Sequence, residues 1–173
     1  LRKFYTFYIV TFGVTLGIAF SRNMLTLYLC YELLTFITLP LVAHTPGDRS
    51  KYAGKKYLIY SVSGASLSFV GMMIVLSKTG TLDFVYGGIG KVPQDNVLLF
   101  AYLLMFVGFG VKAAIFPLHG WLPAASVAPT TVTALLHAVA VVKSGVFAIM
   151  RTTYYLFGTD FLFGTWAQNV VMT

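Results

Sequence analysis

Five apolar runs divide this chain, and each is about as long as a helix that crosses a bilayer. They lie at about residues 4–20, 23–43, 56–77, 97–116 and 130–150. A hydrocarbon core of about 30 Å needs roughly 20 helical residues, and backbone groups in lipid must find partners within the protein, so such runs form helices. The sequence predicts an all-α, polytopic membrane helix bundle with about five to six transmembrane helices.

The composition agrees with a membrane setting. Hydrophobic residues make up 58% of the chain and charged residues 10%, which leaves too little polar surface to cover a soluble globule. The net charge of +7 would suggest nucleic acid binding in a soluble protein, but here the basic residues gather beside apolar runs, where they fix orientation. We expect a multi-pass membrane protein with no nucleic acid partner.

Cysteine and histidine restrict the cofactors that the chain can hold. Cys30 is the only cysteine, so the chain alone builds no disulfide framework, zinc site or iron–sulfur site. His44, His119 and His137 offer no facing mid-membrane pair of the kind that a bis-histidine haem requires. We expect neither a cofactor nor a metal site.

Polar segments separate the runs. Residues 44–55 contain Pro46, Gly47 and a cluster of charges, which is typical of a solvated loop, and residues 78–96 form a second predicted loop. The tail, residues 152–173, is aromatic but interrupted by glycine, and we expect either a further helix or an interfacial segment.

Basic residues predict the orientation. The densest Lys/Arg group beside the membrane lies in the first loop, which predicts that this loop faces the cytoplasm. Arg22 and Arg151 then fall on the outer side. The group consists of Arg49, Lys51, Lys55 and Lys56.

Three ionisable residues stand near the middle of apolar runs: Glu32, Lys112 and Lys143. Each costs about 2.5–3.5 kcal/mol to insert on translocon-type scales, so their retention points to charge movement through the membrane. Each has an alternative explanation. Lys112 can snorkel to the interface, Glu32 can form a structural ion pair or a protonated acid bonded to a neighbouring helix, and Lys143 can pair with backbone carbonyls.

The fourth run does not end cleanly at Pro117. Proline has no amide hydrogen and clashes with the carbonyl four residues earlier, so a broken helix is predicted, and such backbone survives at membrane depth only beside protein or a water-filled cavity. The break would keep Lys112 in the interior and let His119 exchange a proton with water. The alternative is an interfacial elbow anchored by Trp121.

Further candidates are His137 and Lys56. His137 and Lys143 are six positions apart, which at about 100° per residue puts them on different faces of a regular helix, so they share a path only if the helix is distorted or water bridges them. A neutral histidine packed between helices explains His137 equally well. Lys55 and Lys56 are topology determinants, or one of them faces inward at the cytoplasmic mouth.

Glu32 and Lys112 would form a switch if they interact. An ionised carboxylate stabilises a protonated amine, whereas burial without that partner disfavours the charged form. A small change in geometry can therefore move a proton. The sequence leaves open whether the two side chains meet.

Four runs of the sequence resemble a known family. They are LYLCYELLTFITLPLV, GKKYLIYS, FGVKAAIFPLHGWLPAASVAPT and LLHAVAVVKSGVFAIMR. They look like the central five-helix repeat of the antiporter-like subunits shared by respiratory complex I, membrane-bound hydrogenases, formate hydrogenlyases and multi-subunit cation/proton antiporters. The resemblance covers nearly the whole chain and implies one repeat at residues 1–151, followed by a tail at 152–173.

The resemblance also implies roles for individual residues. Glu32 is similar to the coupling glutamate of the family, Lys112 to the lysine on its broken helix, and Lys143 to the next lysine on its central polar axis. It suggests His137 as a relay and Lys56 as the basic residue that opens the following helix.

Two departures from the family pattern stand out. The family often carries an acidic residue where this chain has Ala124. Family members also contain two inverted repeats, whereas this chain is long enough for one, so we expect a fragment or a split gene product.

The resemblance implies a proton-translocating, antiporter-like membrane subunit of a redox-driven ion pump of the complex I (NADH dehydrogenase) or hydrogenase type, with no redox centre of its own. The alternatives are a sodium/proton antiporter module and a purely structural membrane subunit. The implied partners are other membrane subunits, a peripheral redox arm linked to NADH, ferredoxin or hydrogen, and membrane lipid, with protons or sodium as the transported ions. The expected location is a prokaryotic cell membrane.

Overall fold

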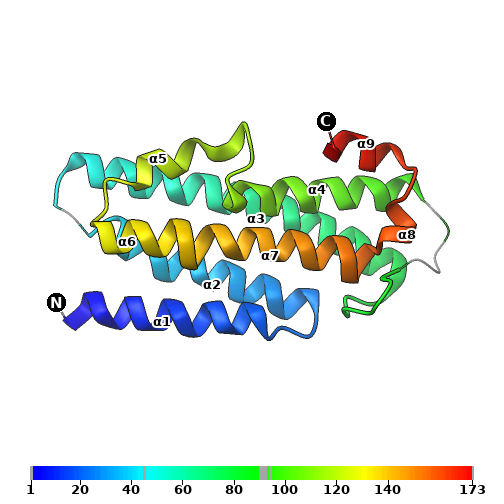
Figure 1. Cartoon of the computed structure of the whole chain (residues 1–173), viewed down its shortest axis with the longest axis horizontal. Coiled ribbons are helices and arrows are strands. Elements are labelled where there is room, and N and C mark those ends of the chain that lie inside the picture. The colour runs from blue at the N-terminus through cyan, green and yellow to red at the C-terminus, as the bar shows by residue number, and fades with distance from the viewer. Residues whose placement is uncertain (1, 45, 90–92, 94, 173) are drawn as a thin grey trace.

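Long helices lie side by side in a computed structural model that describes residues 2–44, 46–89, 93 and 95–172 (Figure 1). The shorter elements follow α4 or end the chain. They are η1 (Leu118–Gly120), α5 (Trp121–Ala125), α8 (Thr159–Leu162) and α9 (Trp166–Met172). The first four long elements are α1 (Arg2–Ala19), α2 (Met24–Val42), α3 (Asp48–Thr79) and α4 (Asn96–Ala113). The fifth is one continuous stretch that consists of α6 (Thr130–Ala134), the π-helical turn η2 (Leu135–Val139), α7 (Val141–Arg151) and a second π-helical turn, η3 (Thr152–Phe157).

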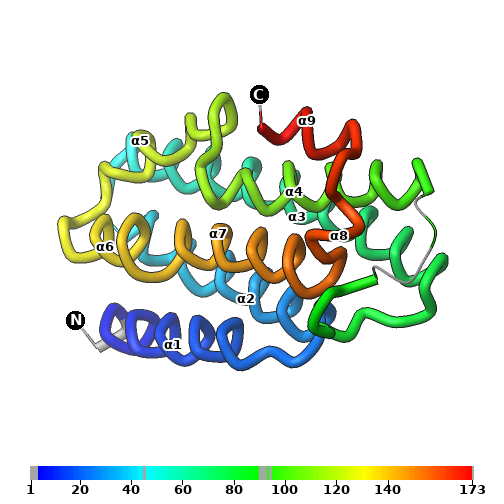
Figure 2. The backbone as a smooth tube through the Cα atoms, turned by 45° about the vertical axis from the view of Figure 1, so that its right-hand side comes forward, coloured from blue at the N-terminus to red at the C-terminus, as the bar shows by residue number. Residues whose placement is uncertain are grey.

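The described residues confirm the predicted polytopic helical bundle. Four helical stretches in this part of the chain are long and apolar enough to cross a membrane, and a shorter apolar helix at Phe4–Ala19 accompanies them. The four are Met24–Val42, Asp48–Thr79, Asn96–Ala125 and Thr130–Phe157. Helix α1 lies at the edge of the bundle against α2 (Figure 2).

Helix α3 corrects the first predicted loop. Residues 48–55 are helical, so the prediction of a solvated loop over 44–55 was wrong for most of that segment. Asp48 stands in the first turn, where its carboxylate interacts favourably with the positive end of the helix dipole. At about 1.5 Å per residue, the helix is about 48 Å long, so its charged first turns extend beyond an apolar core of about 30 Å.

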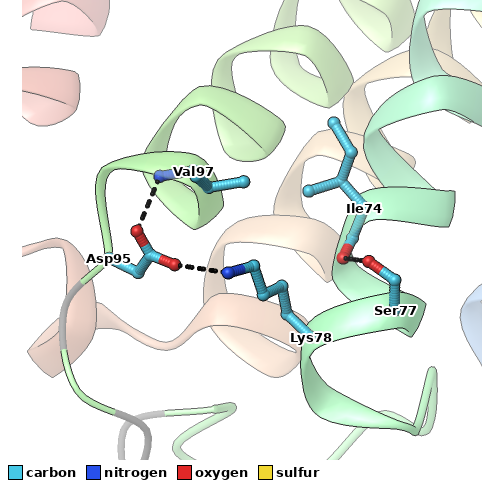
Figure 3. A network of polar contacts seen from close by, with 5 residues as sticks. All are labelled: Ile74, Ser77, Lys78, Asp95 and Val97. Atoms are coloured by element: carbon cyan, nitrogen blue, oxygen red, sulfur yellow. Dashed lines mark hydrogen bonds and ion pairs between the residues drawn. The ribbon is translucent and has the colours of Figure 1, made fainter.

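The second predicted loop is confirmed where it is described, since α3 ends at Thr79 and α4 begins at Asn96. Residues 90–92 and 94 of that loop lie outside the described residues. The loop ends are joined by an ion pair between Lys78 Nζ and Asp95 Oδ2 at 3.1 Å (Figure 3). The Val97 amide donates to Asp95 Oδ1 at 3.1 Å, and together these contacts lower the pKa of the Asp95 carboxyl.

The predicted helix break is present, but it begins before the proline. Helix α4 ends at Ala113, and Ala114 adopts a left-handed conformation with φ 58°. Pro117 lacks the amide that would bond to Ala113, and the residue before a proline avoids helical geometry, so the preceding turn is lost as well. The chain resumes as η1 and α5, with a cis peptide bond between Phe116 and Pro117.

Small residues let the central helices approach one another. A Cβ atom on Gly64 of α3 would lie 2.7 Å from the carbonyl oxygen of Gly108 on α4. Such backbone proximity is typical of membrane helices, whose association depends on close van der Waals packing. The α3–α4 pair therefore forms the centre of the bundle, with α2, α5 and α7 packed around it.

Candidate functional site

Lys112 is the most deeply buried charge in the described part of the chain. It occupies the last turn of α4 and has 0% exposed surface. Its Nζ donates a hydrogen bond to the backbone carbonyl of Tyr31 on α2 and lies 3.4 Å from the centroid of the Tyr31 ring. The side chain thus turns into the bundle instead of snorkelling to the interface.

The Lys112 ammonium lies over the ring of Tyr31, which packs against Phe109. The rings of Tyr31 and Phe109 meet edge to face, with centroids 5.0 Å apart, and both side chains are fully buried. A ring face attracts a cation through its quadrupole. The protonated lysine is therefore stabilised by one carbonyl and one π face, and its ammonium keeps the capacity to donate further hydrogen bonds.

Glu32 follows Tyr31 on α2 and lies near the lysine. Lys112 Nζ bonds to the carbonyl of the residue before Glu32, yet among the described residues the carboxylate and the ammonium form no direct ion pair. The side chain is half-buried, and its Oε1 is a buried atom without a hydrogen-bond partner in the described part of the protein.

Several buried hydroxyl groups lie on α2 and α3. Those without a hydrogen-bond partner among the described residues belong to Tyr31, Thr35, Ser61 and Ser68. An unpaired buried polar group costs about 1–3 kcal/mol, and such groups commonly bind ordered water. The unpaired hydroxyls of α2 and α3 are therefore groups that ordered water would satisfy.

A second part of this polar face points towards the helix break. Thr38 and Tyr57 join α2 to α3 through a hydroxyl–hydroxyl hydrogen bond of 2.8 Å. The Tyr57 ring lies 5.2 Å from the ring of Trp121 on α5. Trp121 Nε1 in turn donates to the carbonyl oxygen of Val111 at 2.7 Å, so the indole ties the two sides of the break together beside Lys112.

Lys56 and the segment around His119 meet near the α2–α3 end of the bundle. Lys56 is half-buried, with its Nζ 6.0 Å from the Tyr60 ring centroid. A Cβ on Gly120 would lie 3.8 Å from that Nζ. His119 itself is exposed and stacks on Phe116 with ring centroids 5.7 Å apart, a position open to exchange with the surroundings.

His137 and Lys143 lie apart from the group formed by Lys112, Tyr31, Phe109 and Glu32, which we call the Lys112 cluster. His137 stands in the π-helical turn η2, half-buried, with its Nε2 3.4 Å from Ser126 Oγ. Lys143 is exposed on α7. Two residues later, a Cβ on Gly145 would lie 2.5 Å from the Ala113 amide nitrogen, so α7 touches α4 beside Lys112 while Lys143 turns away.

Sequence reasoning missed the residues that surround Lys112. Tyr31 contacts Lys112 directly, Trp121 bonds to the carbonyl of the preceding residue, Val111, and Tyr57 with Thr38 extends the polar face. A signal for part of this was present, because Ser61, Ser68 and Tyr57 recur at about helical spacing in an apolar run. The carbonyl contact and the indole contact depend on tertiary packing and leave no such pattern.

A known protein family matches most of this chain. The family described as "NADH:quinone oxidoreductase/Mrp antiporter, TM" matches residues 21–173. The chain belongs to this family. The prediction made from the four sequence runs is thereby confirmed, and the chain is a multi-pass membrane protein.

Relatives of this chain include bacterial Na(+)/H(+) antiporter subunits. The chain is 31% identical over 156 residues to one from Alkalihalophilus pseudofirmus, a match that covers 88% of this chain and 19% of the relative. It is 33% identical over 157 residues to one from Staphylococcus aureus, covering 88% and 20%. The chain thus spans about one fifth of these relatives' length.

Solved structures share the fold of this family chain. The archaeal membrane-bound sulfane sulfur reductase superposes with a TM-score of 0.78 at 22% identity over 90% of this chain and 32% of the other. Respiratory complex I from Thermus thermophilus gives 0.72 at 24% identity over 87% and 34%. The Mrp complex from Dietzia gives 0.72 at 17% identity over 84% and 28%.

Proposed function

We propose that this chain is a proton-translocating module of a multi-subunit membrane complex, with Lys112 as its central proton carrier. The observation that carries the proposal is a fully buried lysine, held by one carbonyl and one ring, beside a glutamate whose buried oxygen has no partner among the described residues. An ionisable residue inside a membrane bundle is rarely retained for packing alone.

The Glu32–Lys112 pair supplies the switch. When Glu32 approaches in its ionised form, it stabilises the protonated lysine; when the two separate, burial favours release of the proton to neighbouring water. The unpaired buried hydroxyls of α2 and α3 supply hydrogen-bond partners for that water. Thr38 and Tyr57 extend the route towards the end of the bundle where Lys56 and His119 lie.

Lys143 and His137 take the later positions on the path in this proposal. The exposed Lys143 would join the axis when the remaining length of a longer subunit covers α7, and the π-helical turn around His137 allows that helix to shift. Other membrane subunits of the complex would complete the route to the opposite face.

The setting that we favour is a sodium/proton antiporter, because relatives above 30% identity carry that name. A redox-driven pump with a peripheral redox arm is the second candidate, supported by the fold shared with complex I and the sulfane sulfur reductase. Purified complexes in vesicles separate the two. A sodium gradient alone moves protons in the first setting, and only an electron donor does so in the second.

The test of the module itself uses the full complex in proteoliposomes with a pH-sensitive dye inside. We expect Lys112→Met and Glu32→Gln to lower proton movement by roughly tenfold or more, which corresponds to a loss of about 1.4 kcal/mol in the limiting step. Lys51→Met, which removes an exposed lysine of α3, is the control. Normal proton movement in an assembled Lys112→Met complex would favour a purely structural role.

A further inference from the structure

Arg151 ends α7 inside an aromatic enclosure that the proton path does not use. The guanidinium carbon lies 5.1 Å from the ring centroid of Phe84, 5.2 Å from that of Phe147 and 5.2 Å from that of Tyr155. Ring faces stabilise a guanidinium while leaving its in-plane N–H donors available. Among the described residues Arg151 forms no ion pair, so an anion can still bind it.

The arginine lines a cavity of about 610 Å³ at the end of the bundle. Tyr86, Tyr154 and Asp160 line the same cavity. The Asp160 carboxylate is exposed and is not paired with Arg151 in the described part of the chain. One space therefore presents a cation and an anion that are separated from one another.

The walls of the cavity are preformed. The loop after α3 is bonded to the end of η3: the Val85 amide donates to the Tyr155 carbonyl at 3.0 Å, and the Ile89 amide donates to the Leu156 carbonyl at 3.0 Å. Two segments far apart in the sequence, the loop after α3 and the end of η3, thus lie side by side. A preformed site loses little conformational entropy when it binds a ligand.

We propose that this cavity binds the head group of a zwitterionic phospholipid of the phosphatidylethanolamine type. The phosphate meets the Arg151 guanidinium, which donates to phosphate in a bidentate geometry. The ammonium group meets the Asp160 carboxylate and the faces of the exposed tyrosines. The two separated charges of the cavity match the two charges of the head group.

The place of the cavity favours a lipid. It lies at the carboxyl end of the stretch Thr130–Phe157, which is long and apolar enough to cross a membrane. Tyr86 and Tyr154 are exposed there, as is typical of aromatic residues at a membrane interface. Phe147 and Met150 add apolar lining on the side that leads along α7. They form a surface for the glycerol backbone and the first methylenes of the chains.

A photo-crosslinker at Tyr154 tests the occupant in native membranes that contain the full complex. Tyr154 is 52% exposed, so the replacement is tolerated by packing. Irradiation is expected to add the mass of a phospholipid to the tryptic peptide that carries the crosslinker. An adduct with a polypeptide instead would overturn the proposal, because a segment of protein would then occupy the cavity.

Arg151→Gln tests the recognition, with Arg22→Gln as the matched control. Both arginines lie beside Phe84, whose amide donates to the Arg22 carbonyl and whose ring faces Arg151, and the Arg22 side chain is exposed. In native mass spectrometry of the complex, Arg151→Gln should retain phosphatidylethanolamine roughly tenfold less well, as expected for a lost charge-assisted contact, and Arg22→Gln should not.

Two further results complete the test of lipid recognition. An excess of inorganic phosphate should fail to displace the lipid, since the ammonium and glycerol contacts are absent from it. Equal retention of phosphatidylethanolamine in Arg151→Gln and wild type, or displacement by phosphate alone, would contradict a phospholipid head-group site.

Discussion

At the scale of single residues, the hydroxyl of Tyr57 is the most informative group outside the charged pair. It is fully buried and bonds to Thr38, and it stands between the Lys112 cluster and the end of the bundle where Lys56 lies. A hydroxyl in such a position both stabilises the packing of two helices and can pass a proton.

Tyr57→Phe should therefore affect transport and stability together. We expect a loss of about 1 kcal/mol in the free energy of unfolding, the usual value for one buried hydrogen bond, and slower proton movement in proteoliposomes. Tyr52→Phe, at a 64% exposed position on the same helix, is the control and should change neither quantity. Unchanged proton movement in Tyr57→Phe would exclude the hydroxyl from the route.

Asp95 gives a pH-dependent prediction outside the membrane. Its pKa is lowered by the Val97 amide and by Lys78, so its stabilising contacts are present above the ordinary value of 3.8 and are lost as the pH falls through the lower folded value. We expect the wild type to be slightly more stable than Asp95→Asn near neutral pH, with the difference vanishing in acid. Thermal unfolding in detergent at several pH values measures this, and a difference that grows in acid would contradict it.

At the scale of elements, the helix break is fixed by an indole contact and not by the proline alone. Trp121 bonds to the Val111 carbonyl next to the residue that carries the proposed function. The broken end of α4 is therefore held in one position relative to α5 and α3.

Trp121→Phe should loosen this element. The ring contact with Tyr57 is kept, but the N–H donor to Val111 is lost, so we expect a cost of about 1–3 kcal/mol in unfolding free energy and reduced proton movement. Trp166→Phe is the matched control, because Trp166 Nε1 donates to Asn96 Oδ1 at 3.2 Å at an exposed site. A larger effect from Trp166→Phe than from Trp121→Phe would disprove this role of the indole.

The sequence predicts these elements unevenly. The spans at 23–43 and 97–116 agree with α2 and α4 to within three residues, because apolar length and Pro117 determine them locally. The helical residues 48–55 and the π-helical turns at 135–139 and 152–157 escape such reasoning, since packing against neighbouring helices overrides local polarity and regular hydrogen bonding. For the site, the positions of Glu32 and Lys112 within apolar runs follow from the sequence, whereas their proximity, the Tyr31 carbonyl contact and the outward direction of Lys143 depend on tertiary packing.

At the scale of the whole molecule, the helical stretch that contains α7 has an exposed apolar face that needs a neighbour in the complex. Val139 and Val146 are exposed on the helical stretch that carries Lys143. A lysine facing lipid costs several kcal/mol, so in the proposed function another part of a longer subunit covers this face.

A photo-crosslinker at Val139 should therefore join a polypeptide segment when the full complex is irradiated in its membrane. The same crosslinker at Leu29, an exposed position on α2, provides a comparison on another face. Mass spectrometry of the products measures both. Lipid adducts alone at Val139 would show that Lys143 faces the bilayer and would remove it from the path.

The contact between Gly145 and the Ala113 amide has a mechanical consequence. Because backbone meets backbone at this point, a displacement there is not absorbed by the bending of a flexible side chain. If the end of α4 shifts during a proton transfer, α7 must therefore shift with it. The positions of Lys112 on α4 and Lys143 on α7 would then change together, which would couple the two ends of the proposed path through the backbone.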